Sequence, residues 1–319
     1  MRILTALAIA AMAATAAFPA SAQDFPNKPV QMIVPFPPGG GTDILGRIVA
    51  KALSEKWGQP VVVENRPGAS GAIGAKQAMQ AAGDGYTLLM ASTGTLLTLA
   101  EDVPEGETFD VNTMLTPLSQ VAAPPYMLVV NPKVEAKTVD EFIALAKKEP
   151  RKITYGSSGV GSASHLTGAL FEDMAGVELL HIPYKGTGQA VTDLLSGEVS
   201  AMFGPAPTLQ PHIAGGSLRA IALTSTGKSA LFPEMTTVAE TLKGYESVGW
   251  FGLYLPPKAD AAIVKRVNED IVAVLNDEAV KKEMAQQSAE PAPMTPEQYG
   301  TWVNDDIRKW LAIMKKAKG

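Results

Sequence analysis

The sequence predicts an α/β protein of two similar lobes, and three observations lead to this prediction. A strand, a glycine-rich loop and a helix follow one another in the first third of the chain. The same order returns in the middle third. Two apolar, proline-flanked segments, 123–133 and 247–258, connect the two halves and lead back to a helical C-terminal part. Alternating strands and helices are typical of parallel sheets, so we expect two such sheets, although no residue-level repeat relates them.

The first half contains three expected strands. The apolar run 30–36 predicts a buried strand, and the glycine loop PFPPGGGTD lies at its end. A helix with one apolar face follows and ends at Gly58. The apolar face of this helix consists of Ile44, Leu45, Ile48, Val49 and Leu53. Residues 60–65 form the second expected strand, which the loop RPGASG connects to another helix. Residues 86–92 form the third, followed by the polar turn STGT.

The second half repeats this order. A strand at 152–158 enters the loop GSSGVGS, and a helix at 163–176 follows it. The strand ELLHIPY, the loop KGTGQ, a helix at 189–197 and a strand at 199–204 complete the unit. From residue 259 onward the chain is expected to be helical. The final helix is expected to anchor on the first lobe through Trp302, Ile307, Trp310 and Ile313.

The N-terminus and the composition restrict the class of protein. Met1-Arg2 precedes an uncharged apolar run, and ASA at 20–22 has the small-x-small form of a cleavage site. These features indicate a secretory signal peptide at residues 1–22, with a retained membrane anchor as the alternative. The remainder is long enough for two modest domains or one large one. The chain has no cysteine and a net charge of −5, which disfavours disulfides, thiolate metal sites and binding to nucleic acid or anionic lipid.

Four glycine loops are expected at the carboxyl ends of strands, where α/β sheets bind their ligands. They are PPGGGTD, RPGASG, GSSGVGS and YKGTG. Each loop places N–H groups at the start of a helix, which favours an anion, and nearby hydroxyl groups add neutral donors. Each loop is alternatively a simple βα turn, above all RPGASG. Asp43 is expected to cap its helix, and Lys185 either attracts an anion or is simply solvated.

Nucleotide binding and hydrolysis are weaker alternatives. GGGTD lacks the Lys-Ser/Thr pair of an NTPase phosphate loop, and no G-x-G-x-x-G follows the first strand. The run 156–159, GSSG, is one residue short of a nucleophile elbow. The three histidines lack metal-ligand spacing. His165 is expected to donate a hydrogen bond to its loop or to a ligand, while His181 and His212 are expected to be ordinary core or surface residues.

Five segments carry a resemblance to a known family: FPNKPVQMIVPFPPGGGTD, QPVVVENRPGASGAIGA, YGSSGVGSASHLTG, HIPYKGTGQAVTDLLSGEV and LRAIALTS. Nearly end to end, the chain resembles the Bug (TctC-like) extracytoplasmic solute receptors of the tripartite tricarboxylate transporters. The resemblance implies a two-lobed, periplasmic-binding-protein-like (type II) fold, in which two crossing strands join two α/β lobes. Residues 23–123 and 248–319 would form lobe 1, and residues 124–247 would form lobe 2.

The same resemblance implies a periplasmic receptor that closes on a small carboxylate and delivers it to a membrane permease. It implies a protein without cofactor, metal or catalytic residues, expected to be a monomer. The implied contacts of the first lobe are Phe36, Gly40, Gly41, Thr42, Ser92 and Thr93. Those of the second lobe are Ser157, Ser158, Gly161, Ser162, His165, Tyr184 and Lys185.

One stretch departs from the family pattern. Where many relatives have an acidic or amide residue, as in FDN, this chain has FGPAPT at 203–208. Such a residue would engage a ligand ammonium or hydroxyl group. Its absence, at Gly204, therefore favours a plain mono- or dicarboxylate, aliphatic or aromatic, over an amino acid. Two other functions stay open: a secreted carboxylate-processing enzyme, and a receptor that presents its closed form to a periplasmic signalling domain.

Overall fold

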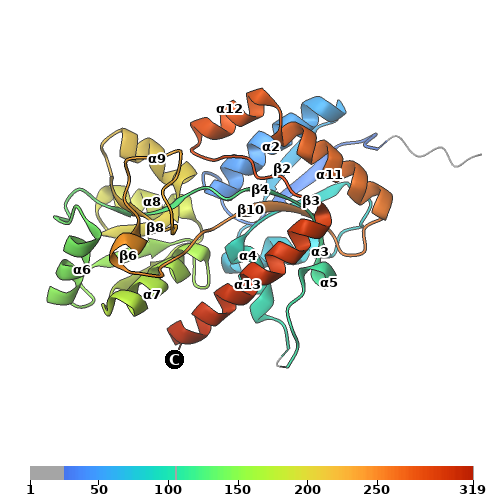
Figure 1. The fold of residues 1–319 in the computed structure, drawn as a ribbon. Helices are drawn as coiled ribbons and strands as arrows, with labels where there is room; N and C mark the ends of the chain where they lie inside the picture. Colours follow the sequence, from blue (N-terminus) through green and yellow to red (C-terminus); the bar gives the residue numbers. More distant parts are fainter. Residues whose placement is uncertain (1–24, 105, 319) are drawn as a thin grey trace, which may run out of the picture.

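Two five-stranded sheets organise the chain into two lobes that lie side by side (Figure 1). The computed structural model describes residues 25–104 and 106–318, with side chains as far as Met314. The predicted signal peptide at 1–22 therefore lies outside the described residues. We call the lobe built on the N-terminal strands the first lobe and the other the second lobe.

The first sheet has the strand order β2-β1-β3-β10-β4. Its strands are β1 (Val30–Val34), β2 (Val61–Asn65), β3 (Thr87–Ser92), β4 (Thr116–Ala122) and β10 (Phe251–Leu255). One face packs on α2 (Gly41–Trp57), α11 (Ala261–Leu275) and α12 (Glu278–Gln286). The other packs on α3 (Ala72–Met79), α4 (Thr93–Glu101), α5 (Val111–Met114) and α13 (Pro296–Lys318), and the short helix η1 (Ala69–Gly71) precedes α3.

The second sheet has the strand order β7-β6-β8-β5-β9. Its strands are β5 (Tyr126–Val130), β6 (Thr154–Ser157), β7 (Leu180–Pro183), β8 (Ala201–Pro205) and β9 (Arg219–Leu223). Helices α6 (Val139–Lys148), α7 (Ala163–Ala175) and α10 (Val238–Thr241) cover one face. Helices α8 (Thr187–Ser196) and α9 (Ala206–Ala214) cover the other.

The prediction of purely parallel sheets is wrong for one strand in each lobe. Strands β1, β2 and β3 run parallel, as do β6, β7 and β8. However, β10 runs antiparallel to β3 and β4, and β5 runs antiparallel to β8 and β9. Both exceptions belong to the proline-flanked segments that connect the lobes. Because each segment enters its sheet from the opposite lobe, its strand runs against its neighbours.

The second crossing segment is fixed at both ends. The carbonyl of Ser247 accepts a hydrogen bond from Thr224 Oγ1 at 2.6 Å, and Ser247 Oγ lies 2.6 Å from Thr167 Oγ1, so this end belongs to the second lobe. The N–H of Trp250 donates to Thr93 Oγ1 at 3.0 Å in the first lobe. Between them, Gly249 lies so close to the first crossing segment that a Cβ atom there would be 2.4 Å from the Tyr126 ring. The two crossings therefore touch each other at a position where only glycine fits.

The prediction of a polar turn after β3 is wrong, because helix α4 begins there, at Thr93. The N–H of Ser92 donates to Thr95 Oγ1 at 3.4 Å in a capping box, an arrangement that starts helices. Leu96, Leu97 and Leu99 of this helix are buried. Similarly, α8 begins at Thr187, inside the expected loop KGTGQ.

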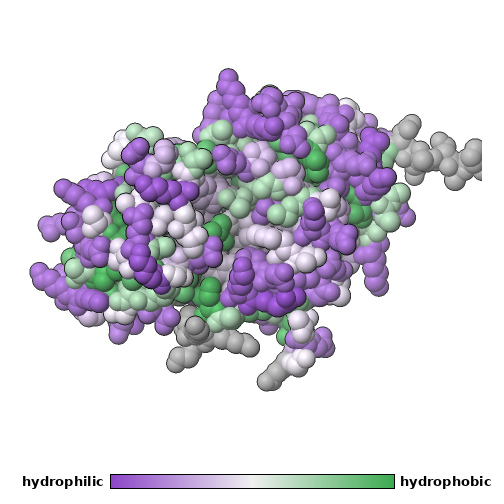
Figure 2. Space-filling model, in the orientation of Figure 1, coloured by the Kyte–Doolittle hydropathy of each residue, from purple (hydrophilic) through white to green (hydrophobic). Residues whose placement is uncertain are grey.

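The final helix anchors on the first lobe as predicted. Ile307 and Trp310 are buried, and Trp302 and Ile313 are partly buried against the same core. Helix α13 also contacts α7 of the second lobe, and Figure 1 shows it extending beneath that lobe. Hydrophilic residues dominate the outer edges of the same view, while paler and hydrophobic residues gather between the lobes (Figure 2). Within the described residues no helix is both long and apolar enough to cross a membrane.

A methyl group at the contact between the crossings should destabilise the protein. We expect Gly249→Ala to lower the free energy of unfolding by about 1–3 kcal/mol, because the new Cβ overpacks against Tyr126. Urea unfolding of the two proteins measures this difference. Gly227→Ala is the matched control, since nothing lies within 4 Å of its Cβ position. Equal stabilities of both variants would contradict the close contact at Gly249.

Candidate functional site

The starts of five helices converge between the lobes. Helices α2 and α4 follow β1 and β3 in the first lobe, and α7, α8 and α9 follow β6, β7 and β8 in the second. All five follow the carboxyl ends of parallel strands, where ligand sites of α/β sheets lie. Each helix N-terminus carries a partial positive charge and N–H groups without helical partners. Their convergence therefore makes an environment that favours an anion.

A small cavity of about 20 Å³ lies at this convergence. Seven predicted contact residues line it: Phe36, Gly40, Gly41, Thr42, Ser92, Ser158 and Ser162. Six further residues also line it: Gly94, Tyr126, Ala163, Thr187, Pro205 and Phe251. None of these lining residues carries a charged side chain. The polarity of the cavity therefore comes from backbone groups and hydroxyls.

Three of the converging helices have no side-chain cap, and two of these, α2 and α8, follow a glycine. Gly40 precedes α2 and Gly186 precedes α8, and neither offers a side chain to the first N–H groups of its helix. In contrast, Ser162 caps α7 by accepting a hydrogen bond from the N–H of His165 at 3.3 Å. The first turns of α2 and α8 thus keep N–H groups that can donate hydrogen bonds to an anionic ligand.

Rings form the apolar part of the cavity wall, namely those of Phe36, Tyr126, Pro205 and Phe251. The Phe251 ring lies so near Gly41 that a Cβ atom there would be 2.9 Å from its Cζ. Burial raises the pKa of Tyr126 far above its ordinary value, so its phenol stays neutral. The wall can therefore pack against an uncharged hydrocarbon portion of a ligand.

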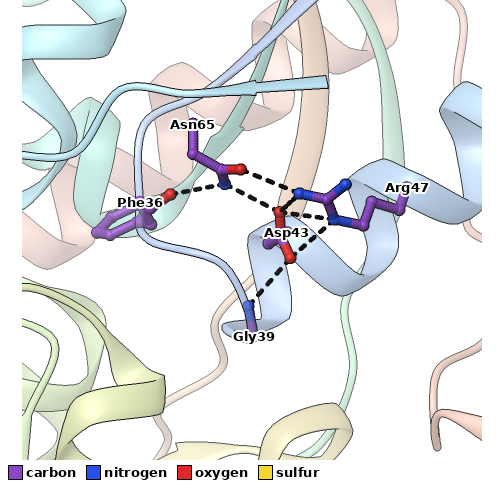
Figure 3. Close-up of polar contacts among 5 residues, drawn as sticks. All are labelled: Phe36, Gly39, Asp43, Arg47 and Asn65. Atoms are coloured by element: carbon purple, nitrogen blue, oxygen red, sulfur yellow. Dashed lines mark hydrogen bonds and ion pairs between the residues drawn. The ribbon is translucent and has the colours of Figure 1, made fainter. Parts of the chain in front are cut away.

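The Asp43 carboxylate organises the glycine loop in front of α2 (Figure 3). It accepts hydrogen bonds from the Gly39 N–H at 3.0 Å, from Asn65 Nδ2 at 2.9 Å and from Arg47 Nε at 3.0 Å. Asn65 Nδ2 also donates to the carbonyl of Phe36 at 2.9 Å. These bonds connect both ends of the loop to the adjacent strand and helix.

The expectation that Asp43 caps its helix is wrong. Gly40 is the N-cap residue, and Asp43, three positions later, reaches back to Gly39. Burial raises the pKa of this carboxyl group, but the hydrogen bonds from Arg47, Asn65 and Gly39 and the charge of Arg47 outweigh it and hold the pKa below its ordinary value. The carboxylate is therefore ionised at neutral pH. It accepts its hydrogen bonds from the loop and its neighbours and not from a ligand.

The other predicted contact residues lie outside the cavity lining. Thr93 is fully buried and accepts from the Trp250 N–H. Ser157 is also fully buried, and its Oγ lies 2.6 Å from Nε2 of His181. Tyr184 and Lys185 line a separate groove of about 360 Å³ between the lobes. The remaining two, Gly161 and His165, contact each other in the loop that follows β6.

In its contact with Gly161, His165 is the acceptor, whereas we expected it to donate to its loop or to a ligand. Its Nδ1 accepts a hydrogen bond from the Gly161 N–H at 3.1 Å. His181 was expected to be an ordinary histidine, yet it pairs with Ser157 and stacks on His165, with ring centroids 4.1 Å apart. Among the residues described, no group of three His, Cys, Asp or Glu side chains could hold a metal ion.

The lobes touch each other around the cavity. Ser70 Oγ of the first lobe donates to the carbonyl of Val160 in the second at 2.6 Å. A Cβ atom at Gly94 would lie 3.1 Å from the Ala163 nitrogen. A Cβ atom at Gly186 would lie 2.7 Å from the Pro37 ring. The structure is thus a closed arrangement, whose cavity has room for little more than one water molecule.

Several of the lining residues that were not predicted belong to segments that stand out in the sequence for other reasons. Tyr126 and Phe251 belong to the two crossing segments, and Thr187 belongs to the loop YKGTG. Pro205 lies in the divergent stretch FGPAPT, where Gly204 was expected to face the ligand. A Cβ atom at Gly204 would instead meet Leu209 and Met202 at 3.2 Å, inside the second lobe. Because neighbouring residues of a strand face opposite ways, Pro205 is the residue at the cavity.

Comparisons with known proteins agree on one family. Residues 45–318 match the model of the tripartite tricarboxylate transporter family receptor, TctC. The protein BugT of Bordetella pertussis is 39% identical over 318 residues, which covers 99% of this chain and 97% of BugT.

Solved structures give the same result. The R. palustris protein Rpa4515, solved with adipate, is 32% identical with a TM-score of 0.86, covering 92% of this chain and 98% of that one. MatC from Rhodopseudomonas palustris, solved with bound malate, is 26% identical with a TM-score of 0.84, covering 91% and 99%. The two-lobed arrangement described above is thus that of solute-binding receptors.

Loss of the Asp43 charge should loosen the glycine loop. We expect Asp43→Asn to lower the free energy of unfolding at pH 7 by about 1–3 kcal/mol, chiefly through its buried hydrogen bonds, because Arg47 is half exposed. The folded-state pKa lies below the ordinary 3.8. The contribution of the ionised group is therefore present above that value and is lost as the pH falls through the folded-state pKa. Urea unfolding from pH 7 to pH 3 measures both effects, and the difference between the proteins should shrink at the acid end.

Asp305→Asn is the matched control for this variant. Asp305 pairs with Arg308 at 2.6 Å across one helical turn, and both side chains are more than half exposed. Its loss should change the free energy of unfolding by less than about 0.5 kcal/mol. If Asp43→Asn behaved like this control at pH 7, the role assigned to its carboxylate would be wrong.

Proposed function

Because this chain belongs to the tripartite tricarboxylate transporter family of receptors, we propose that it captures a small carboxylate between its lobes and delivers it to a membrane permease. The observation that carries the proposal is the convergence of five helix N-termini on a cavity without charged side chains. We further propose that the mature protein acts in the periplasm as a monomer, after removal of residues 1–22. Residues 23–123 and 248–319 would then move as one lobe, and residues 124–247 as the other.

Backbone donors can hold a carboxylate here without a cationic side chain. Each hydrogen bond to a charged group contributes about 1.5–3 kcal/mol. A helix N-terminus adds about 0.3–1 kcal/mol for a nearby negative charge. The uncapped first turns of α2 and α8 lie on opposite sides of the cavity, and the hydroxyls of Ser92, Ser158 and Thr187 lie beside them. One carboxylate group bridging these donors would hold both lobes together.

The cavity wall favours a ligand without an ammonium group. No carboxylate side chain lines the cavity, and the Asp43 carboxylate is hydrogen-bonded to the glycine loop of the first lobe. Pro205 and Phe251 instead place apolar rings beside the donors. The adipate and malate found in related structures are dicarboxylates without an amino group. We therefore propose a plain carboxylate, and the identity of its remaining part follows from how it packs against these rings.

Ligand entry requires the lobes to separate. A cavity of about 20 Å³ is smaller than either dicarboxylate needs. The crossings at 123–125 and at Val248–Gly249 are the short connections about which the lobes would rotate. A ligand that contacts both lobes shifts the population from the open state toward a closed state slightly wider than the arrangement described here, whose cavity is about 20 Å³. The permease, or a periplasmic sensor domain in the alternative role, would then recognise the closed form.

A carboxylate-processing enzyme is the alternative with one supporting observation. Ser157 Oγ and His181 Nε2 are 2.6 Å apart, within the range of a nucleophile and its base. However, Ser157 is fully buried beneath its loop and does not line the cavity. A substrate in the cavity could not reach its hydroxyl, so the receptor is the better proposal.

The ligand class is tested by thermal unfolding of the mature protein with malate, adipate, aspartate and ATP. We expect malate or adipate to raise the unfolding temperature, because a ligand at 100 times its Kd adds about 2.7 kcal/mol to the stability of the folded state. Aspartate and ATP should leave it unchanged. A higher unfolding temperature with aspartate alone would contradict the conclusion that the cavity lining favours a ligand without an ammonium group. A higher unfolding temperature with ATP alone would contradict the proposed function.

Closure of the lobes is tested by adding a side chain at the contact between α4 and α7. In Gly94→Val, the new side chain would meet Ser162 and Ala163 of the second lobe, so the lobes should no longer close fully. We expect the affinity for the dicarboxylate to fall roughly tenfold or more, because the closed state becomes less populated. Gly227→Val, on an open loop, is the control.

The same variants allow a direct measurement of the interlobe distance. The chain has no cysteine, so spin labels can be placed on Val62→Cys and Lys147→Cys, two exposed positions in different lobes. Ligand should shorten the distance between the labels in the background protein and in the Gly227→Val control. If Gly94→Val closed equally well, the contact would not limit closure.

A further inference from the structure

A column of three rings lies beneath the loop that the second lobe contributes to the cavity. Tyr155 stacks on His181 with centroids 4.9 Å apart, and His181 stacks on His165 with centroids 4.1 Å apart. The three residues come from β6, β7 and α7, and the loop 158–162 connects β6 to α7. The column thus joins the two ends of the loop to the neighbouring strand.

One end of the loop is held through Ser157. Its Oγ lies 2.6 Å from His181 Nε2, accepts from the Gly159 N–H at 3.1 Å and lies 3.1 Å from the Gly159 carbonyl. Ser162 Oγ donates to the same carbonyl at 2.7 Å. Ser162 lines the cavity, so the position of this ligand-facing hydroxyl depends on a network that begins at His181.

The other end of the loop is held by His165, whose Nδ1 accepts from the Gly161 N–H at 3.1 Å. Gly161 has φ +77°, a conformation that favours glycine, so the loop turns sharply here. The acceptor role requires Nδ1 of His165 to be without a proton.

His181 remains neutral under physiological conditions. Burial and the neighbouring His165 lower the pKa of His181 to about 4. Glu172 lies beside Tyr155 at the end of the column, and burial raises the pKa of its carboxyl group. Glu101 of the first lobe lies near Gly161, where a Cβ atom would be 3.4 Å from its Oε2. The bond between Ser157 and His181 is therefore made by a neutral His181 imidazole at neutral pH.

We propose that His181 and His165 are positioning residues, which fix the loop 158–162 in its ligand-binding shape and so set the affinity for the carboxylate. This inference rests on the proposed function. It assigns to His181, acting through Ser157, a role without contact to the ligand. It also separates Ser157 and His165, which act from beneath the loop, from Ser158 and Ser162, which line the cavity.

A double-mutant cycle tests the connection between His181 and Ser157. His181→Phe keeps a stacking ring but removes the bond to Ser157, and Ser157→Ala removes the same bond from its other side. We expect each to weaken malate or adipate binding roughly tenfold, and the double variant to bind about as well as either single one. His181→Gln, whose amide can restore the bond, should recover part of the affinity. Independent, additive losses would overturn the proposed connection.

Tyr254→Phe is the matched control. It removes a buried hydrogen bond of the same length, 2.6 Å to Tyr299, in the core of the first lobe. This variant should lose stability in urea without losing affinity. If it lost affinity as His181→Phe does, the effect of His181 would be one of general stability and not of loop position.

Amide hydrogen exchange tests the loop without any ligand. The Gly161 N–H should exchange about tenfold faster in His165→Phe and in His181→Phe than in the original protein or in Tyr254→Phe. If malate and adipate both fail to bind the original protein while Gly161 exchange behaves in this way, the proposed ligand class is wrong and the positioning role stands. If ligand binds but neither affinity nor exchange responds to the histidine variants, the positioning role is wrong and the receptor function stands.

Discussion

The ionised carboxylate of Asp43 holds the glycine loop from which the first lobe offers its N–H groups. Three glycines in succession have a large conformational freedom, and without external bonds this freedom would oppose a defined binding shape. Asp43 removes it by joining Gly39 to Asn65 and Arg47, and Asn65 extends the network to the Phe36 carbonyl. The negative charge needed for this task is neutralised locally by Arg47, so the cavity itself stays free of charged side chains.

The second lobe solves the same problem with different groups. Its loop 158–162 also contains left-handed glycines, Gly159 and Gly161, but hydroxyl and imidazole groups hold it. A carboxylate beneath this loop would repel an anionic ligand, whereas the neutral His181 ring does not. Both lobes therefore present rigid backbone donors, one supported by a compensated ion pair and the other by a neutral network. This shared outcome suits the proposed capture and release of an anion.

The proposed closure and ligand recognition involve the same few residues. Tyr126 and Phe251 line the cavity and also lie at the crossings between the lobes. A ligand that packs against these rings would therefore contact the connections about which we propose that the lobes rotate. The α13 helix contacts both lobes, and Asp306 on it accepts a hydrogen bond from Trp250 Nε1 at 2.7 Å, which fixes one crossing from behind. In the proposed function, ligand binding and lobe movement would thus be coupled through these side chains.

The sequence by itself determined the alternation of strands and helices, the glycine loops at strand ends and the family, because these follow from local spacing and from long matched segments. It placed seven of the predicted contacts at the cavity lining. Only the tertiary structure decided the antiparallel strands β5 and β10, since their direction depends on the lobe from which the chain arrives. It likewise decided that Pro205 and not Gly204 faces the cavity, that Asp43 braces a loop, and that His181 supports Ser157. Each of these depends on a partner distant in the sequence or on the face that a side chain takes, and no local pattern encodes either.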